Sequence, residues 1–372
     1  MRLAWFNIAH DRVRFGVTVL GITCAVFLMV FQGSVLFGFL RAASRIIDAT
    51  DADIWISGRG VPCFEFPVPL ERRFLEIAHS IPGVLQTSRI CTRLVPFRMQ
   101  DGRSQQVALV GADTTVGREF PIPHVDGDSG AVEPDGLLVD RSNIALLDVS
   151  RLPWDVEIND QRARVVGETS GFSSFLGSPY VFTSYLDAAR YLHLGSEESM
   201  FILVAVAPGV SVRAVQRGLR ARLPSVDVWT RTEFSNRSRT YWITQTGAGG
   251  AILMAALLGF CIGLAVVSQS IYATTMENIE EFATLKALGA SHGFIVGVIL
   301  TQAFVCGATG YVLGLGVTFP MIRAAKASIP WVTSPWWLPP FVLVPTLAMC
   351  ALASLVSVRA ALSIDPAKVF RA

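Results

Sequence analysis

Four long apolar segments set the pattern of this chain. They cover residues 15–40, 247–273, 294–320 and 336–358, and none contains Asp, Glu, Lys, Arg or His. Each exceeds the roughly 20 apolar residues that cross a bilayer as a helix. The pattern therefore predicts four transmembrane helices, with no ionisable residue inside them to relay protons or to bind an ion.

Between the first two apolar segments, residues 41–246 form a polar region of short alternating stretches. The alternation predicts strands at 53–56, 90–99, 105–111, 201–207 and 226–230, and a hairpin over 156–166 that turns at Asn159-Asp160. Helical periodicity predicts helices at 70–81 and 211–223. Residues 180–192 read as a strand that runs into a helix. This order predicts an α+β domain with a second subdomain at about 113–199. Cys63 and Cys91 lie in it, and the sequence leaves open whether they form a disulfide.

A charged amphipathic segment, Glu277–Ala290, separates the second and third apolar segments. Glu277 and Glu280 stand near its start, Lys286 near its end and Gly289 after it, which are typical signals of a short helix. An apolar stripe of Ile279, Phe282, Leu285 and Leu288 falls about one turn apart and requires a partner. By itself this pattern is equally compatible with a solvated connector and with a docking element.

Small and polar residues add detail to the predicted spans. Glycine pairs four residues apart occur at Gly259/Gly263, Gly293/Gly297 and Gly310/Gly314, a spacing that permits close helix packing. Gln32, Gln269 and Gln302 are the notable polar residues, and we expect interhelical hydrogen bonds from them. Pro339, Pro340 and Pro345 should bend or delay the fourth helix.

Composition and charge narrow the class of protein. The 372 residues are 52% hydrophobic and only 16% charged, which is typical of a membrane protein. A net charge of +2 without basic clusters indicates no nucleic-acid partner. The chain has no GxxxxGK[ST] motif and no GxSxG motif, and its histidines lack metal-ligand spacing. We therefore expect a non-catalytic chain that binds no metal or cofactor itself.

Four spans place both termini on one side of the membrane. Lys and Arg residues near the two ends favour the cytoplasmic side, with the domain at 41–246 exported. Residues 1–14 are expected to form an interfacial helix, 274–293 a cytoplasmic helix and loop, 321–335 an outer loop and 359–372 a cytoplasmic tail. The first span is too long for a signal peptide and reads as a retained anchor.

Several stretches resemble the FtsX-like and MacB-like permeases of ABC transporters. They are LAWFNIAHDRVRFGVTVLGI from Leu3, LLVDRSNIALLDV from Leu137, the segment from Ile202 to Val228, EEFATLKALGAS from Glu280 and IDPAKVFRA from Ile364. The EFATLKALG wording and Tyr241-Trp242 are most similar to DevC-type permeases. The resemblance covers essentially the whole chain.

The resemblance implies a permease that couples ATP hydrolysis by a separate subunit to movement of the exported domain. ATP and Mg would be bound by that ATPase subunit. It further implies a homodimer, or a closely related heterodimer, in the bacterial inner membrane. The DevC-type likeness implies a periplasmic membrane-fusion adaptor, a TolC-like outer-membrane duct and a lipid-like or amphiphilic substrate. An alternative from the same superfamily is a scaffold that regulates a periplasmic cell-wall hydrolase without export. A stand-alone membrane enzyme is the weakest reading, because no catalytic constellation is found.

The same resemblance assigns roles within the charged segment. Glu281 would contact the ATPase as an anion or acceptor, Phe282 and Leu285 would fill a groove on its surface, and Gly289 would end the helix. The full set of expected coupling residues is Glu277, Glu280, Glu281, Phe282, Leu285, Lys286, Leu288 and Gly289.

Overall fold

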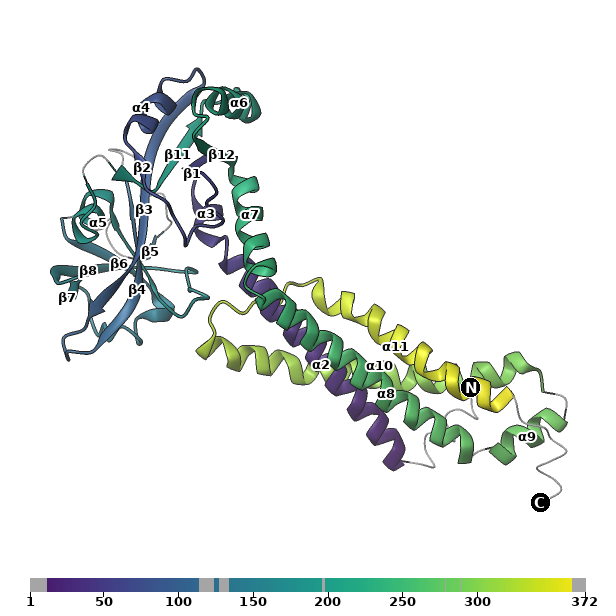
Figure 1. Cartoon of the computed structure of the whole chain (residues 1–372). Coiled ribbons are helices and arrows are strands. Elements are labelled where there is room, and N and C mark those ends of the chain that lie inside the picture. Colours follow the sequence, from purple (N-terminus) through teal and green to yellow (C-terminus); the bar gives the residue numbers. More distant parts are fainter. Residues whose placement is uncertain are drawn as a thin grey trace. The chain divides into compact units, whose positions relative to one another are not determined.

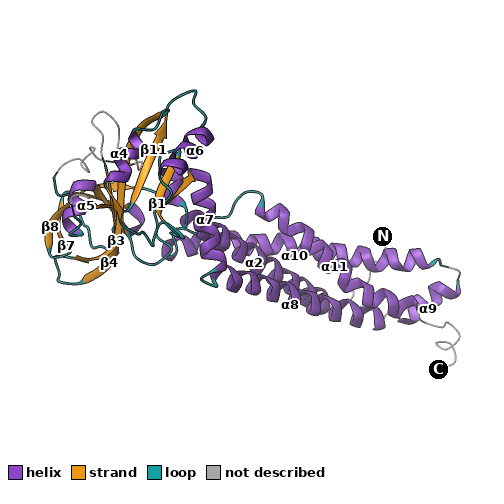
Figure 2. Cartoon of the chain, turned by 45° about the horizontal axis from the view of Figure 1, so that its top comes forward, coloured by secondary structure: helices purple, strands orange, loops and turns teal. Residues whose placement is uncertain are grey.

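The computed structural model describes residues 12–113, 124–126, 134–195, 198–277, 279–288 and 290–362. The chain divides into two compact units, Met1–Gly38 with Gly249–Ala372, and Phe39–Ala248. Four long helices build the first unit, and a large sheet with short helices builds the second (Figures 1 and 2). This confirms the predicted fold class, four long apolar helices with an α+β domain between the first and second.

The helical unit contains α2 (Arg12–Ala42), α8 (Ala248–Glu277), α10 (His292–Ser328) and α11 (Leu338–Leu362). By length and composition all four can cross a membrane, over Phe15–Ala42, Ala248–Glu277, His292–Ala325 and Leu338–Arg359. The segment predicted as an interfacial helix falls mostly on residues 1–11, outside the described part, and Arg12 already belongs to α2. Most of the predicted tail, residues 363–372, is likewise outside it.

Two expectations about helix ends were wrong. Helix α10 continues through Pro320 to Ser328, into the segment expected to be an outer loop, because the Ala, Arg and Lys residues that follow the proline are strong helix formers. Helix α11 is not delayed by Pro339 and Pro340. They occupy its first turn, where a missing N–H costs no helical hydrogen bond. Neither helix end could be read from hydropathy alone.

Helix α2 packs against glycines of the helices around it. A Cβ placed on Gly310 of α10 would lie 2.6 Å from the Ile22 Cβ atom, and one on Gly263 of α8 would lie 2.5 Å from the Ala25 Cβ atom. The threonine hydroxyl of Thr23 also donates to the Gly310 carbonyl at 3.3 Å. Two of the three predicted glycine pairs therefore let α2 approach its neighbours closely. We expected Gln302 to form an interhelical hydrogen bond. Its amide nitrogen is buried and has no hydrogen-bond partner among the described residues.

The second unit is built on one mixed ten-stranded sheet. Its order is β12-β1-β11-β3-β4-β9-β6-β8-β5, with β7 paired to β3 and β8, and only β4–β9 and β6–β8 are parallel. The strands of this sheet are β1 (Ile54–Gly58), β3 (Val84–Arg98), β4 (Ser104–Ala112), β5 (His124–Asp126), β6 (Gly136–Asp140), β7 (Trp154–Ile158), β8 (Gln161–Thr169), β9 (Tyr180–Ser184), β11 (Phe201–Val206) and β12 (Val226–Thr230). The segment predicted as a second subdomain, at about 113–199, contributes strands β5 to β9. These strands belong to the same sheet as the rest of the domain.

Short helices cover this sheet or connect its strands. They are α3 (Arg45–Ala49), α4 (Arg73–His79), the 3-10 helix η2 (Arg141–Asn143), α5 (Tyr185–Tyr191), α6 (Val212–Arg222) and α7 (Arg231–Thr244). The helix expected at 70–81 is shorter than predicted. Leu70–Glu71 instead forms β2, which pairs with β10 (Glu198–Ser199).

Side chains of β1 alternate between two hydrophobic cores. Ile54 and Ile56 face a core shared with α4 and α6, whereas Trp55 faces a larger core with Phe201 and Phe234. Because both faces are covered, every residue of β1 is buried, which explains its continuous apolar sequence. Cys63 and Cys91 are both buried, and each is a free thiol.

Helix α7 was missed by the sequence reading, although its start carries a capping box. The Thr230 hydroxyl accepts from the Glu233 backbone N–H at 3.3 Å, and the Glu233 carboxylate accepts from the Thr230 N–H at 2.9 Å. Thr-x-x-Glu is the signal that could have revealed it. The helix is fastened to the chain after α2 because Ser238 donates to the Ala43 carbonyl and Arg239 pairs with Asp48, both at 2.7 Å.

We expect Gly310→Val to destabilise the helical unit. Overpacking typically costs about 1–3 kcal/mol, and here the new side chain meets Ile22 as well as the Val19 carbonyl oxygen 3.1 Å from its Cβ position. Thermal unfolding in detergent should show a lower Tm. Gly316→Val is the matched control in the same helix, because nothing lies within 4 Å of its Cβ position. An equal loss in both variants would contradict this packing.

We expect Glu233→Gln to lower stability at neutral pH but not in strong acid. Partial burial alone would raise the pKa of Glu233, but hydrogen bonds from Thr230, Gln216 and Arg213 outweigh it and lower the pKa from 4.5 to about 2. Because the pKa of Glu233 is lower in the folded state than in the unfolded state, its ionised carboxylate stabilises the fold above pH 4.5. This contribution is lost as the pH falls toward 2. Unfolding at pH 7 and pH 2 measures it, with the exposed Glu71→Gln as control. A pH-independent difference between Glu233→Gln and the parent would be inconsistent with this origin.

Candidate functional site

The charged segment between α8 and α10 forms a separate helix, α9 (Ile279–Ala287). Glu277 is the last residue of α8, so it precedes α9. On the other side Ser291 caps α10, where its hydroxyl accepts from the Phe294 N–H at 3.3 Å. Figures 1 and 2 show α9 at the end of the helical unit where α8 ends and α10 begins. The short helix is therefore delimited at both ends and is not an extension of either span.

One face of α9 is turned toward protein. Ala283 is completely buried, and Ile279 and Lys286, which lie one turn away on either side, are partly buried. The buried alanine was not predicted, because the sequence reading looked for large apolar residues. The i, i+4, i+7 spacing of these three residues is the signal that could have found it. This face anchors α9, so it leaves the opposite face for other contacts.

The opposite face of α9 is open. Glu280, Thr284 and Leu288 are exposed, and Leu288 has 80% of its surface accessible. The Thr284 hydroxyl donates to the Glu280 carbonyl at 2.8 Å, so it is satisfied within the helix. A carboxylate and an exposed leucine about two turns apart are compatible with a docking surface. Single exposed leucines are also common on solvated surfaces, so the position of α9 between two spans is needed as further support.

The expected coupling residues are thus partly located. Glu280 and Leu288 lie together on the open face, Lys286 lies at the edge of the packed face, and Glu277 lies before the helix. The side chains of Glu281, Phe282 and Leu285 and the whole of Gly289 fall outside the described part. The acidic residue near the start of α9 and the lysine in its last turn both suit the helix dipole.

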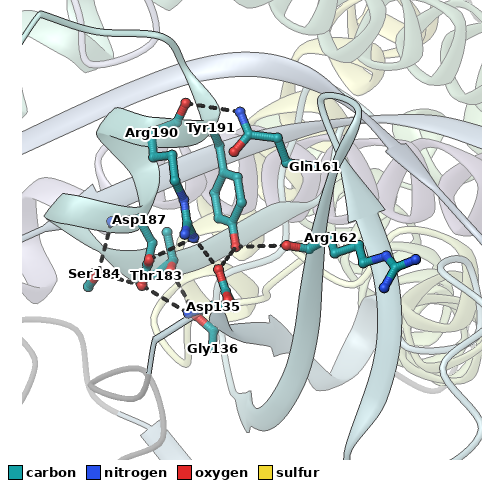
Figure 3. A network of polar contacts seen from close by, with 9 residues as sticks. All are labelled: Asp135, Gly136, Gln161, Arg162, Thr183, Ser184, Asp187, Arg190 and Tyr191. Atoms are coloured by element: carbon teal, nitrogen blue, oxygen red, sulfur yellow. Dashed lines mark hydrogen bonds and ion pairs between the residues drawn. The ribbon is translucent and has the colours of Figure 1, made fainter.

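A partly exposed polar network in the α+β domain, in which Asp187 and Tyr191 are buried but Arg190 and Asp135 are not, is the other candidate site. Arg190 lies between two carboxylates, pairing with Asp135 and with Asp187 at 2.9 Å (Figure 3). The Ser184 hydroxyl donates to Asp187 at 2.8 Å and accepts from its backbone N–H at 3.1 Å. Tyr191 donates to Asp135 at 3.2 Å. Among the described residues no histidine contacts Ser184, and its bonds to Asp187 are those of a helix cap, so the network caps α5 and fastens it to the start of β6.

The described residues contain no group of three or more His, Cys, Asp or Glu side chains that could hold a metal ion. The arrangement that remains is a four-helix membrane unit with an exposed charged helix between its second and third spans, and an α+β domain after the first span. That combination is the arrangement expected of an ABC-type permease.

Comparison with known families agrees with this class. Residues 15–222 match the MacB-like periplasmic core domain, and residues 250–366 match the FtsX-like permease C-terminal family. The first match alone covers more than half of the chain. The chain belongs to the MacB-like and FtsX-like family of ABC transporter permeases, which are typically non-catalytic and work with an ATPase subunit.

Individual relatives and solved structures are similar to this chain at low sequence identity. Uncharacterized ABC transporter permeases of Mycobacterium tuberculosis and Mycobacterium bovis are 23% identical over 345 residues, which is 90% of this chain and 88% of theirs. The periplasmic region of MacB from Actinobacillus actinomycetemcomitans is 11% identical with a TM-score of 0.40, covering 51% of this chain and 94% of that one. The extracellular domain of the noncanonic ABC-type transporter YknZ from Gram-positive bacteria is 10% identical with a TM-score of 0.37, covering 48% and 98%.

The two faces of α9 can be tested by cysteine labelling. In a chain whose native cysteines are replaced by alanine, Leu288→Cys should react rapidly with a water-soluble maleimide, and Ala283→Cys should be protected because it is buried. The labelling rates of the two variants in detergent are the measurement. Equal rates would contradict the assignment of the buried and open faces.

Proposed function

We propose that this permease is the mechanotransmission subunit of an export complex of the DevC type. In this proposal ATP-driven movements of a separate ATPase are received by α9 and passed through the membrane helices to the exported domain. The observation that carries it is α9 itself, a short helix with one face anchored by Ala283 and the other exposing Glu280 and Leu288.

The spans favour a mechanical role over a conducting one. The four apolar segments contain no ionisable residue that could coordinate a polar cargo in a pore. Helix α2 is packed closely against glycines of α8 and α10, with a Cβ at Gly314 only 2.8 Å from the Val26 Cβ atom. Closely packed helices resist deformation and move as one body, which is what transmission of force needs.

A homodimer with both termini in the cytoplasm is part of the proposal. Among the described residues, the third glycine pair contacts no other helix: nothing lies within 4 Å of a Cβ on Gly297, and the nearby Ser291 hydroxyl lies 4.0 Å from one on Gly293. Such a pair is suited to packing against a helix of a second copy. Basic residues near the chain ends support the cytoplasmic location.

The remaining partners follow from the DevC-type resemblance of EFATLKALG and Tyr241-Trp242. They are a periplasmic membrane-fusion adaptor and a TolC-like duct, with a lipid-like or amphiphilic substrate. The ATPase subunit would carry ATP and Mg.

The double substitution Glu281→Ala with Phe282→Ala should disconnect the ATPase. Loss of an acceptor and of an aromatic anchor at an interface commonly costs 2 kcal/mol or more, about a 30-fold weakening. The measurement is recovery of the ATPase with this chain from gently solubilised membranes, together with ATP turnover and export. Thr284→Ala is the control in the same helix, because its hydroxyl is bonded within the helix.

Three outcomes separate the possibilities. Loss of the ATPase with retention of an adaptor supports the export complex. Recovery of a cell-wall hydrolase in place of an adaptor supports the regulatory scaffold. Unchanged binding and transport in the double variant would refute the assignment of α9 as the coupling helix.

A further inference from the structure

A single carboxyl group joins three parts of the α+β domain. Glu65 lies in the irregular segment between β1 and β2. Its Oε1 atom accepts from the Tyr180 hydroxyl and its Oε2 atom accepts from the Trp242 indole N–H, both at 3.2 Å. Tyr180 begins β9, and Trp242 lies on α7. The carboxyl group therefore connects the sheet, the segment after β1 and α7.

The segment that carries Glu65 is held firmly on both sides of it. Cys63 is completely buried, and the Phe64 ring stacks on Phe201 at 5.4 Å between centroids. After Glu65, the Phe66 ring packs on Trp242 at 6.1 Å, and Trp242 also meets Phe175 edge-on at 4.8 Å. Aromatic rings thus flank the carboxyl group, although Glu65 is only partly buried and Phe66 is half exposed, so its two hydrogen bonds rather than full enclosure hold it in place.

No cation is paired with Glu65 among the described residues. The arginines of the neighbouring elements bind elsewhere: Arg45 donates to the Gly171 carbonyl, Arg237 to the Val61 carbonyl and Arg239 to Asp48. The titratable groups that face Glu65 are the Cys63 thiol, from its own segment, and the Tyr180 hydroxyl, from β9. An ionised Glu65 would therefore be a buried charge without a counterion, which is costly.

Burial raises the pKa of Glu65 above its usual 4.5, and hydrogen bonds from Trp242, Cys63 and Tyr180 oppose the rise only in part. Burial also raises the pKa of Cys63 and of Tyr180. Those two groups remain protonated at neutral pH, so Glu65 is the member of the cluster that changes protonation as the pH moves upward from 4.5.

The side chains around Glu65 can form hydrogen bonds with its neutral carboxylic acid as well as with its carboxylate. An indole N–H can only donate, so Oε2 remains an acceptor in both states. The Tyr180 hydroxyl donates to the Glu65 carboxylate. When Glu65 is a carboxylic acid, the same hydroxyl can accept a hydrogen bond from it and donate one to the Ser174 hydroxyl, with which it also interacts. A proton on Oε1 therefore leaves every donor satisfied and removes the buried charge.

We propose that Glu65 is a proton-controlled latch that fastens α7 to the sheet. With the proton bound, the latch joins Trp242 and Tyr180 without an uncompensated charge. When the proton leaves, a carboxylate without a counterion remains between α7 and β9, and the attachment weakens. Helix α7 is followed by α8 after only three residues. The consequence for force transmission rests on the proposed function, whereas the latch itself does not.

The sign of the pH dependence follows from the raised pKa. A carboxyl group that binds its proton more tightly in the folded state stabilises that state below pH 4.5, and this contribution is lost as the pH rises through the folded-state pKa. For one proton the loss can reach about tenfold in the opening equilibrium per pH unit. Glu65→Gln carries no titrating proton, so it should abolish the dependence.

Hydrogen exchange of the full chain in lipid nanodiscs, without the ATPase, tests the latch. Protection of amides in α7 and β9 is measured between pH 5 and 8 and corrected for the intrinsic rate of exchange. We expect the parent chain to lose protection as the pH rises and Glu65→Gln to retain it. Glu71→Gln, an exposed carboxyl in the same domain, should behave as the parent. Parallel profiles in the parent and Glu65→Gln would overturn the latch.

A second variant separates a proton latch from a merely structural bond. Trp242→Phe removes a donor that lowers the pKa of Glu65, so the loss of protection should extend to higher pH. An unchanged profile shape with uniformly lower protection would show a structural bond only. The difference infrared spectrum of the parent minus Glu65→Gln should also contain the band of a protonated carboxyl group at pH 4.5, and its absence there would count against the proposal. None of these readouts depends on the coupling role of α9, so either proposal can fail alone.

Discussion

The close approach of α2 to its neighbouring helices is the constraint on which the membrane unit depends. Within a bilayer, burial of apolar surface gives no net drive for helix association, so contact must come from fit. Glycines of α8 and α10 supply that fit, because a Cβ at Gly263 or Gly310 would overlap with α2. Polar bonds such as Thr23 to the Gly310 carbonyl supplement it. The unit therefore holds together through shape, and it can do so without any charged residue in its interior.

Helix α7 has a comparable position in the α+β domain. Phe234 inserts into the larger core, Ser238 and Arg239 hold the chain that follows α2, and Trp242 reaches Glu65. Successive turns of one helix thus contact the core, the end of the first span and the segment after β1. Two hydrophobic cores bury the two faces of β1, so α7 joins a part of the sheet that is already well packed. In the proposed mechanism, movement of the domain would depend on how firmly α7 is attached.

Hydropathy and alternation predicted the four spans and most strands, because burial on one or two faces leaves a direct trace in the residue pattern. The hairpin at Asn159-Asp160 was likewise visible, and both residues adopt the positive φ that its turn requires. The predictions failed where a feature depends on contacts with neighbouring elements of the fold. The end of α10, the role of Ala283 and the meeting of Glu65 with Trp242 and Tyr180 depend on residues far apart in sequence or on small side chains. The charged segment was recognised, but its packed face was not.

Helix α10 has 37 residues, which at 1.5 Å per residue is about 55 Å, well beyond the roughly 30 Å of a hydrocarbon core. Pro320 lacks the N–H that would bond the Gly316 carbonyl, so the rod has one weak point in its later part. The stretch before that point begins immediately after α9. A tilt of about 10° at its start would displace the far end of a 55 Å rod by about 10 Å. The geometry of α10 is that of a lever arm, in which a small rotation near α9 becomes a larger excursion at the other end.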